Sequence, residues 1–360
     1  MTETDIDADI PADNGRHGTS KNNGSPPLES RTASSNVKVS IYLLIDRMLQ
    51  YISVFLITLS GFLSIGVCIY FMYHWRACWF LWLLYIPWIV LDRNTAWEGG
   101  STSRYQWFRD GIWWKYYRDY FNVKLHKTAD LDPSKKYLMV YAPHGIYCLG
   151  ATVSVQTPYC GFKELFPGIN IRTGTLDTNF HVPFWREWQF AFKLVSVSAK
   201  SLTHILRKSE PGSSCMIVVG GAEEAKYAYP GENRLVLKNR KGFVKLAIKT
   251  GASLVPVFCF GESDTYYQLR GPLVSRYHAW FKKHFGWVHI LFWGHLPFIT
   301  MPRKVQLAVV VGAPVAVDIQ DNPCDEYVDH VWDEYVRALY KAYDAYKDVY
   351  APGVPLEIVA

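Results

Sequence analysis

What the sequence of 360 residues lacks removes several kinds of chemistry. It contains no Gly-Lys dipeptide, so the phosphate-binding P-loop is absent, and no Gly-x-Ser-x-Gly, so the α/β-hydrolase nucleophile is absent too. Cys-x-x-Cys and His-Glu-x-x-His are also missing, so we expect no dedicated metal site. Its 7 cysteines are sparse and odd in number, which excludes a disulfide scaffold and favours reduced thiols.

Charged residues are scarce, at 19% of the chain against about 25% in ordinary soluble domains. Aromatic residues are abundant at 16%, which excludes a mostly disordered chain. Residues 1–40 are the exception, because they are polar, rich in Ser, Asn, Asp and Gly, and without hydrophobic periodicity. We predict a disordered tail there, and its acidic start is unlike a signal or transit peptide.

Two charge-free runs then predict a membrane hairpin over residues 41–91. The first, residues 48–74, has 27 residues without Asp, Glu, Lys or Arg, and a helix needs about 20 to cross a bilayer core. The second, residues 77–91, contains Pro87, and at about 1.5 Å per residue it reaches only ~22 Å. Two arrangements remain open: two antiparallel transmembrane helices that turn near Arg76, or one transmembrane helix followed by a re-entrant segment.

Residues 92–125 continue an unusual concentration of aromatic side chains. Eight of the 14 tryptophans lie between Trp75 and Trp114. Trp and Tyr gather at membrane interfaces, where an apolar ring and a polar group are both accommodated, so we predict an interfacial segment. Four basic residues in it are then predicted to meet lipid headgroups: Arg104, Arg109, Lys115 and Arg118. The alternative is an aromatic stripe within a soluble core.

Residues 126–360 have the pattern of an α/β domain. Four short apolar runs are predicted to be buried strands, at 137–141, 215–219, 253–260 and 305–311. Helical patterns lie near 183–200 and 234–249, and the second ends at Gly251. A last helix is predicted from Asp321 or Asn322, with Pro323 in its first position. One face of it carries Val328, Trp332, Tyr335, Leu339 and Tyr343. The alternation predicts an α/β fold with a mostly parallel sheet flanked by helices.

The candidate site residues follow the predicted strands, where open α/β sheets place their sites. His144 follows the first strand, between Pro143, which stiffens the approach, and Gly145, which permits a sharp turn. Three further groups complete the set. The first is Gly220-Gly221 with Glu223-Glu224, for which a surface turn is the alternative, and the second is Gly261-Glu262. The third is the basic cluster at 238–245, which either binds an anion or forms a solvated helix face.

Together these blocks make the sequence similar to the type-2 diacylglycerol acyltransferase family, which includes monoacylglycerol and wax-alcohol acyltransferases. The resemblance covers about residues 137–338, with the hairpin in the expected place. It rests on seven blocks in one order: Pro143-His144-Gly145, Phe166-Pro167-Gly168, Asn179-Phe180-x-x-Pro183-x-x-Arg186-Glu187, Gly220-Gly221-x-x-Glu224, Arg240-x-Gly242-Phe243-x-Lys245-x-Ala247, Val255-Pro256-x-x-x-Phe260-Gly261-Glu262 and Gly312-x-Pro314.

The resemblance implies a fold of the glycerolipid-acyltransferase type and transfer of a fatty acyl group from acyl-CoA to the free hydroxyl of diacylglycerol. His144 is then the general base that takes the hydroxyl proton, and Glu224 orients its imidazole, with Glu223 in reserve. Main-chain N–H groups at Gly145, Gly220 and Gly221 are predicted to stabilise the oxyanion. The predicted acyl-CoA-binding residues are Arg186, Arg240, Lys241 and Lys245. The predicted structural motif residues are Pro143, Gly242, Phe243, Pro256, Gly261 and Glu262.

Two positions depart from the family pattern. Ala142 stands where the family often has a first histidine, so the proton chemistry must fall to His144. Phe192-Lys193 stand where members often have glycines, which leaves the acceptor open. Monoacylglycerol and long-chain alcohols are the alternative acceptors, attack through Cys148 is the alternative mechanism, and an inactive membrane or lipid-droplet protein is the remote alternative.

The resemblance also implies a setting and partners. It places the enzyme in the endoplasmic reticulum membrane, or on lipid droplets, with the catalytic domain facing the cytosol. The expected partners are acyl-CoA, a lipid acceptor such as diacylglycerol and a phospholipid membrane. We expect no cofactor, no metal and no nucleic acid, and a homo-oligomer is left open.

Overall fold

The computed structural model describes residues 28–100, 103–208, 210–285 and 288–359. Residues from Asp46 onward form one compact part, while the described residues before Asp46 begin helix α1 and are considered by themselves. The predicted tail lies mostly outside the described residues, and α1 begins at Leu28, inside its expected range.

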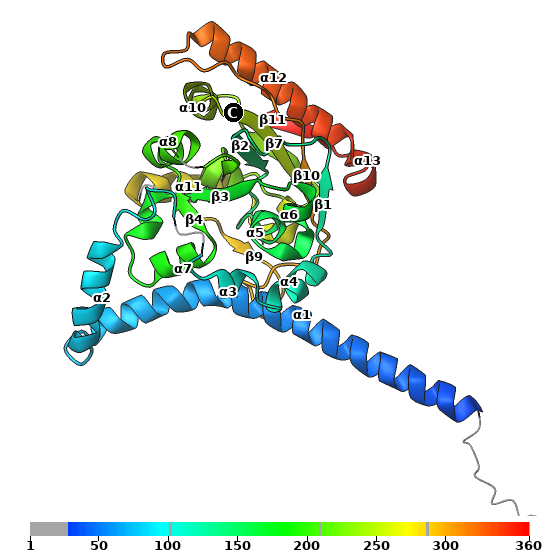
Figure 1. Cartoon of the computed structure of the whole chain (residues 1–360). Coiled ribbons are helices and arrows are strands. Elements are labelled where there is room, and N and C mark those ends of the chain that lie inside the picture. The colour runs from blue at the N-terminus through cyan, green and yellow to red at the C-terminus, as the bar shows by residue number, and fades with distance from the viewer. Residues whose placement is uncertain (1–27, 101–102, 209, 286–287, 360) are drawn as a thin grey trace, which may run out of the picture. The chain divides into compact units, whose positions relative to one another are not determined.

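Helices and strands alternate along the chain (Figure 1). The α-helices are α1 Leu28–Tyr73, α2 Trp79–Leu91, α3 Gln106–Arg109, α4 Trp113–Tyr120, α5 Leu149–Val155, α6 Phe162–Leu165, α7 Trp185–Ala191, α8 Ala199–Lys208, α9 Gly221–Ala225, α10 Gly242–Thr250, α11 Pro272–Phe285, α12 Asp325–Asp344 and α13 Lys347–Tyr350. The strands are β1 Lys124–Lys127, β2 Tyr137–Ala142, β3 Asn170–Thr175, β4 Leu194–Ser196, β5 Ser213–Ile217, β6 Asn233–Val236, β7 Ser253–Phe260, β8 Tyr267–Gln268, β9 Phe292–Trp293, β10 Ala308–Val311 and β11 Leu356–Val359.

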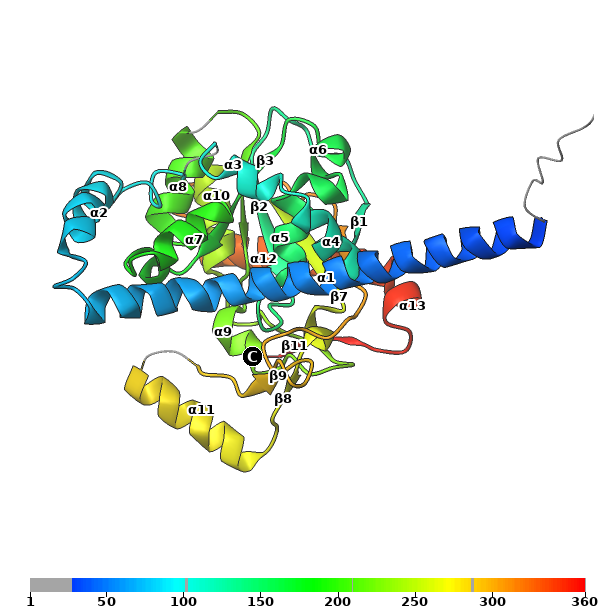
Figure 2. The same cartoon turned by 90° about the horizontal axis from the view of Figure 1, so that it is seen from below.

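The main sheet has seven strands in the order β1-β10-β7-β2-β5-β3-β4. All neighbouring pairs are parallel except β10 with β7, so the predicted mostly parallel sheet is confirmed. Two smaller pairs, β11 with β6 and β8 with β9, lie outside it. Figure 2 shows α11 standing off from the sheet beside β8 and β9.

Helices cover both faces of the sheet, as the buried strands require (Figure 1). Successive β7 residues alternate between two cores, since Leu254 and Phe258 belong to one and Val255 and Val257 to the other. Helices α8, α10 and α12 close the first core, whereas α4 and α5 close the second. The predicted apolar face of α12 is confirmed: Val328, Tyr335, Leu339 and Tyr343 are buried and Trp332 is half-buried.

Two predicted helices are wrong because strands interrupt them. The pattern at 183–200 contains β4, whose Leu194-Val195-Ser196 pairs with β3. The pattern at 234–249 begins with β6, which pairs in parallel with β11 from the far end of the chain, so α10 starts only at Gly242 and ends at Gly251 as predicted. Strand β5 begins and ends two residues earlier than predicted, β10 starts at Ala308, and α12 starts at Asp325.

Within residues 92–125, α4 lies partly in the core while Trp107 and Ile112 are exposed, so the interfacial role of the segment stays a prediction. Trp114, Tyr117 and Tyr120 on α4 are buried in the second core, which is the alternative left open. The basic residues bond within the protein: Arg104 pairs with Asp92, Arg109 donates to main-chain carbonyls, Lys115 and Arg118 pair with Asp119. Aromatic patterns alone do not separate a core from a membrane surface.

One helix among the described residues is long and apolar enough to cross a membrane, the segment Val39–Tyr73 of α1. From Asp46 on, one side of it packs on the α/β part: Val54 is buried, Ser53 Oγ donates to the Trp113 carbonyl (2.6 Å), and Trp188 Nε1 donates to Ser60 Oγ (2.8 Å). A turn at 74–78 leads into α2, which has 13 residues, contains Pro87 and buries none of its side chains. The chain therefore has a long apolar helix, a turn and a short apolar helix in this order, and the membrane hairpin stays a prediction.

Gly261, at the end of β7, lies where the main chain passes close to residue 306, and a substitution there tests this close approach. Its φ is +82°, and a Cβ atom there would lie 2.1 Å from the Gln306 carbonyl oxygen, whereas Gly353 has φ +73° and open space around it. We expect Gly353→Ala to cost about 1 kcal/mol from the left-handed backbone alone. Gly261→Ala should lower the thermal unfolding temperature of the purified chain far more, because the clash adds to this strain. Equal shifts would contradict the close approach of β7 to residue 306.

Candidate active site

The predicted site residues from three strands meet at one edge of the sheet. Strands β7, β2 and β5 are adjacent and parallel, so their carboxyl ends lie together. His144 follows β2, Gly220 and Glu224 follow β5, and Glu262 follows β7. The structure thus brings together the histidine, the double glycine and the Gly-Glu pair, as the rule for open α/β sheets predicts.

The imidazole of His144 is half-buried and contacts the main chain. Its Nδ1 lies 3.2 Å from the carbonyl oxygen of Gly145. Because a carbonyl only accepts, Nδ1 carries the proton in this contact and Nε2 keeps a free lone pair. Burial lowers the pKa of His144 below its ordinary 6.5, with the Gly145 contact opposing the shift. The ring is therefore neutral near pH 7, the form that a general base requires.

Glu224 reaches His144, but it binds the main chain and not the ring. Oε1 accepts the His144 N–H (2.6 Å) and Oε2 accepts the Val236 N–H (2.7 Å). The expectation that Glu224 contacts the imidazole is therefore wrong, because both carboxylate oxygens are used in fixing the backbone. Burial raises the pKa of Glu224 to about 7, opposed by these two N–H groups. Gly220 must be glycine here, since a Cβ atom would lie 2.2 Å from Oε2 of Glu224.

Glu262 holds the other end of the histidine segment. It is fully buried, with Oε1 accepting the Leu149 N–H (2.6 Å) and Oε2 accepting the Gly150 N–H (2.9 Å) and the Tyr141 hydroxyl (2.6 Å). Burial raises its pKa, and these donors oppose the shift. A Cβ atom on Gly145 would lie 2.7 Å from Cγ of Glu262, so the segment passes tightly over this carboxylate.

Cys148 lies in the same segment and is not set up as a nucleophile. Burial raises the pKa of its thiol well above the ordinary value, so the reactive thiolate is disfavoured. Its Sγ donates to the His144 carbonyl at 3.2 Å. These contacts favour the expected direct mechanism over an acyl-cysteine.

Of the predicted acyl-CoA-binding residues, Arg186 and Lys245 line one groove, whereas Arg240 and Lys241 lie outside it. Arg186 is buried and its charge is balanced by Asp92 (2.9 Å) and Glu187 (2.9 Å), so we interpret it as a brace. Lys241 pairs with Asp329 and Lys245 with Asp325, and Arg240 is exposed near Glu224. The remaining motif residues are structural: Gly242 begins α10, the Phe243 ring packs against Tyr335, and Pro256 lies on β7, where its carbonyl accepts the Gly312 N–H.

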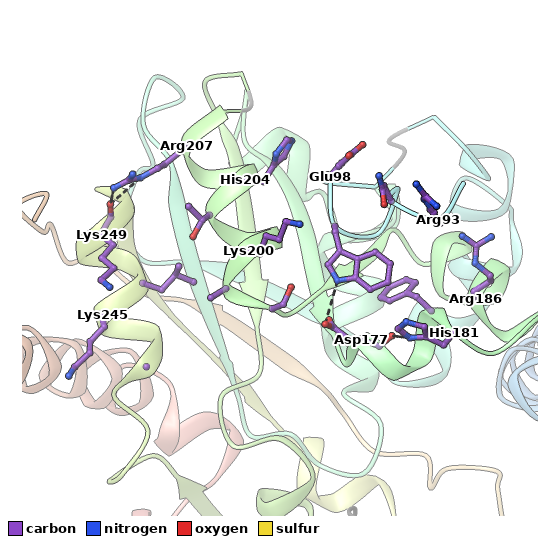
Figure 3. A pocket seen from close by; sticks show the side chains of 18 of the residues that line it. Arg93, Glu98, Asp177, His181, Arg186, Lys200, His204, Arg207, Lys245 and Lys249 are labelled. Atoms are coloured by element: carbon purple, nitrogen blue, oxygen red, sulfur yellow. Dashed lines mark hydrogen bonds between the residues drawn. The ribbon is translucent and has the colours of Figure 1, made fainter. Parts of the chain in front are cut away.

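A large basic groove lies at the same edge of the sheet (Figure 3), and of its Lys and Arg residues only Arg186 and Lys245 were predicted from the sequence. It has a volume of about 1420 Å³ and lies at the carboxyl ends of β3 and β4. Among the residues lining it are Arg93, Trp97, Asp177, His181, Arg186, Lys200, His204, Arg207, Lys245 and Lys249. The spacing of basic residues on α8 and on α10, four apart, is the sequence signal that predicts such a row.

A smaller groove of about 410 Å³ is almost wholly apolar. It lies between α1, α2 and the turn before α7, and it is lined by Phe71, Leu81, Trp82, Leu84, Tyr85, Trp88 and Phe184. Among the described residues no cluster of His, Cys, Asp and Glu has the arrangement of a metal site.

The sequence of this chain is similar to those of proteins named as acyltransferases. A sequence model of the diacylglycerol acyltransferase family matches residues 70–358. Diacylglycerol O-acyltransferase 2A of Umbelopsis ramanniana is 41% identical over 282 residues, covering 76% of this chain and 79% of the relative. Human diacylglycerol O-acyltransferase 2 is 36% identical over 86% of this chain and 82% of its own length.

Human 2-acylglycerol O-acyltransferase 3 is 37% identical, over 85% of this chain and 90% of its own length. No solved structure matches the chain. The likeness to these enzymes covers both the hairpin turn and the whole α/β part, so the class is that of the acyltransferases. The chain belongs to the diacylglycerol acyltransferase family.

A buried ion network joins the membrane-proximal helices to the site domain. Asp92, just after α2, is 6% exposed and receives two guanidinium groups, from Arg104 (2.7 Å) and Arg186 (2.9 Å). These partners hold the pKa of Asp92 below its ordinary value against the effect of burial. Tyr85 of α2 extends the network, because its hydroxyl donates to Glu187 and accepts the Phe184 N–H.

Asp92→Asn should therefore destabilise the fold by about 3–5 kcal/mol, because it leaves two guanidinium groups without their buried partner. The matched control is Asp321→Asn, which breaks an ion pair of similar length (Arg207, 2.8 Å) that is exposed. Exposed pairs contribute about 0–1 kcal/mol, so the control should unfold almost as the parent does. Equal losses in thermal unfolding would contradict a structural role for the network.

Proposed function

We propose that this chain is an acyl-CoA-dependent O-acyltransferase that esterifies the free hydroxyl of diacylglycerol, giving triacylglycerol. The observation that supports it most is His144, neutral through burial and held at the carboxyl end of β2, in a chain that belongs to the diacylglycerol acyltransferase family. The relatives named for diacylglycerol acyl transfer cover most of its length.

In the proposed mechanism Nε2 of His144 takes the hydroxyl proton as the alcohol oxygen attacks the thioester carbonyl. The acyl–oxygen bond forms, the bond to sulfur breaks, and the proton passes on to the departing thiolate of CoA. A general base of this kind contributes about 10²–10⁴-fold to the rate. The Gly145 carbonyl keeps Nδ1 protonated, so it does for the ring what a carboxylate does in a catalytic triad.

Stabilisation of the oxyanion by main-chain N–H groups near Gly145, Gly220 or Gly221 belongs to the same proposal. The backbone at two of these glycines supports this part of the proposal. Gly145 and Gly221 have left-handed φ values of +57° and +55°, which turn the main chain sharply beside His144 and Glu224. The enzyme acts directly with its two substrates, without a resident cofactor or metal.

The setting fits water-insoluble substrates. The long apolar helix α1 indicates membrane association, and the apolar groove between α1 and α2 offers a surface for lipid chains. We place the enzyme in the endoplasmic reticulum membrane with its α/β part in the cytosol, in contact with lipid droplets. The fold is accordingly proposed to be of the glycerolipid-acyltransferase type.

A second acceptor is favoured by one specific finding. The human 2-acylglycerol acyltransferase is as similar to this chain as the diacylglycerol enzymes are, so the shared sequence does not separate the two acceptors. Phe192 and Lys193, which differ from the family pattern, make contacts within the protein: Phe192 is buried against Trp114 and Trp188, and Lys193 Nζ donates to Asn170 Oδ1.

The test is a product assay on membranes from a host that makes no neutral lipid of its own. Labelled acyl-CoA is supplied in turn with diacylglycerol, monoacylglycerol or a long-chain alcohol, and the products are separated by thin-layer chromatography. We expect labelled triacylglycerol from the wild type and less than a few per cent of it from His144→Ala at equal protein level. Retained activity in that variant contradicts the general-base role, and labelled product only with another acceptor contradicts the proposed substrate.

A further inference from the structure

The basic groove carries an inference that the family likeness does not supply. It rests on the proposed function, because it concerns the same acyl donor. We propose that the groove beside β3 and β4 binds the nucleotide end of the acyl donor, the 3′-phosphorylated ADP of CoA.

The charge of the groove favours an anionic ligand. Six Lys or Arg side chains line it against two acids, Glu98 and Asp177. Asp177 is already occupied by neutral donors, the Ser196 hydroxyl and Trp97 Nε1 (3.4 Å). Arg186, Arg207 and Lys245 have acidic partners of their own, but Arg93, Lys200 and Lys249 have no acidic partner among the described residues.

Five of the basic residues that line the cavity lie in two rows, one on α8 and one on α10 (Figure 3). Lys200, His204 and Arg207 lie along α8, and Lys245 and Lys249 lie along α10, at the spacing that puts side chains on one helix face. Lys200 also lies in the first turn of α8, where the helix dipole makes a positive side chain unfavourable. A phosphate bound there would neutralise the Lys200 charge and accept hydrogen bonds from the N–H groups at the start of α8.

The groove also contains an aromatic cluster that suits a nucleobase. Trp97 is half-buried, with its ring 6.1 Å from Phe180 and 5.6 Å from His181 in edge-on arrangements. Aromatic rings beside a basic surface are the combination that binds a base and its phosphates together. A phospholipid headgroup has the phosphate but no base, so the aromatic end favours the nucleotide.

The position of the groove relative to His144 fits an acyl donor bound in an extended conformation. Strands β3 and β4 are two and three places from β2 in the sheet, and strands lie ~4.8 Å apart, so the groove begins roughly 10–14 Å from the histidine strand. All of these strands end at the same edge. A thioester at His144 with its phosphates in the groove therefore lies along one edge of the sheet.

The test compares the purified full chain with Lys200→Ala/Lys249→Ala, using two donors of the same acyl chain, acyl-CoA and acyl-pantetheine. We expect the KM for acyl-CoA to rise about tenfold or more, since each lost contact to a charged group weakens binding by roughly that factor. Turnover at saturation should stay within about twofold, and the kcat/KM for acyl-pantetheine should not change. The control is Lys135→Ala/Lys341→Ala, which removes two exposed lysines outside the groove.

Two results overturn the proposal: an unchanged KM for acyl-CoA, or an equal loss with both donors, which would mean a structural role. A third is a loss that appears only in vesicles containing phosphatidylserine and is absent in neutral detergent, which would assign the groove to a lipid headgroup. Calorimetric titration of each variant with free CoA measures binding without acyl transfer. If the chain does not transfer acyl groups, this titration still shows whether the groove binds CoA, so the two proposals are tested separately.

Discussion

Two buried carboxylates, Glu224 and Glu262, fix the segment on which the proposed chemistry depends. Each accepts main-chain N–H groups, one at His144 and the other at Leu149 and Gly150, so both ends of a short turn are held by acceptors inside the protein. Hydrogen bonds to charged groups contribute about 1.5–3 kcal/mol each, and a buried N–H left without its acceptor costs a similar amount. The glycines around them follow from this packing, because the carboxylates fill the space that side chains at Gly145 and Gly220 would need.

Contacts of α1 and α2 with the α/β part connect the proposed route of lipid access with the proposed site of proton transfer. Helix α1 rests on α4 and α7 through Ser53 and Ser60, and the Asp92 network ties the end of α2 to α7. The apolar helices are thus fixed against the α/β part and are not joined to it by a loose linker. In the proposed function, a substrate that arrives through the bilayer meets a surface whose position relative to the sheet is set by buried ion pairs.

Much of the fold follows from local patterns, and the failures have physical causes. The apolar runs of β2 and β7, the Gly251 cap and the face of α12 were predictable, because burial and capping act within a few residues. Strands β4 and β6 were missed, since each depends on a distant partner and is too short for a clear period. The sequence identified His144, Glu224 and Glu262 as residues at strand ends. It did not identify the hydrogen-bond partners of the two carboxylates, because every residue except proline has a main-chain N–H and no residue type indicates which one is bound.

The central claim is that Glu224 positions the histidine segment and does not act on its ring, and the pH dependence of kcat/KM for acyl transfer tests it most directly. A general base works only when unprotonated, and burial lowers the pKa of His144, so its titration should give kcat/KM an apparent pKa below 6.5. Burial raises the pKa of Glu224 to about 7, and its protonation removes an acceptor for the His144 or Val236 N–H, so the wild-type rate should show a second rise near pH 7. Glu224→Gln puts an amide group against one of two N–H donors, so kcat should fall about tenfold or more at high pH, the rise near pH 7 should disappear, and the apparent pKa below 6.5 should stay unchanged. Glu223→Gln, which alters only a neighbouring carboxylate paired with Lys226 and Lys282, should leave kcat and both rises unchanged. An apparent pKa of the lower rise that moves in Glu224→Gln, or a kcat that stays at the wild-type value, would contradict the claim.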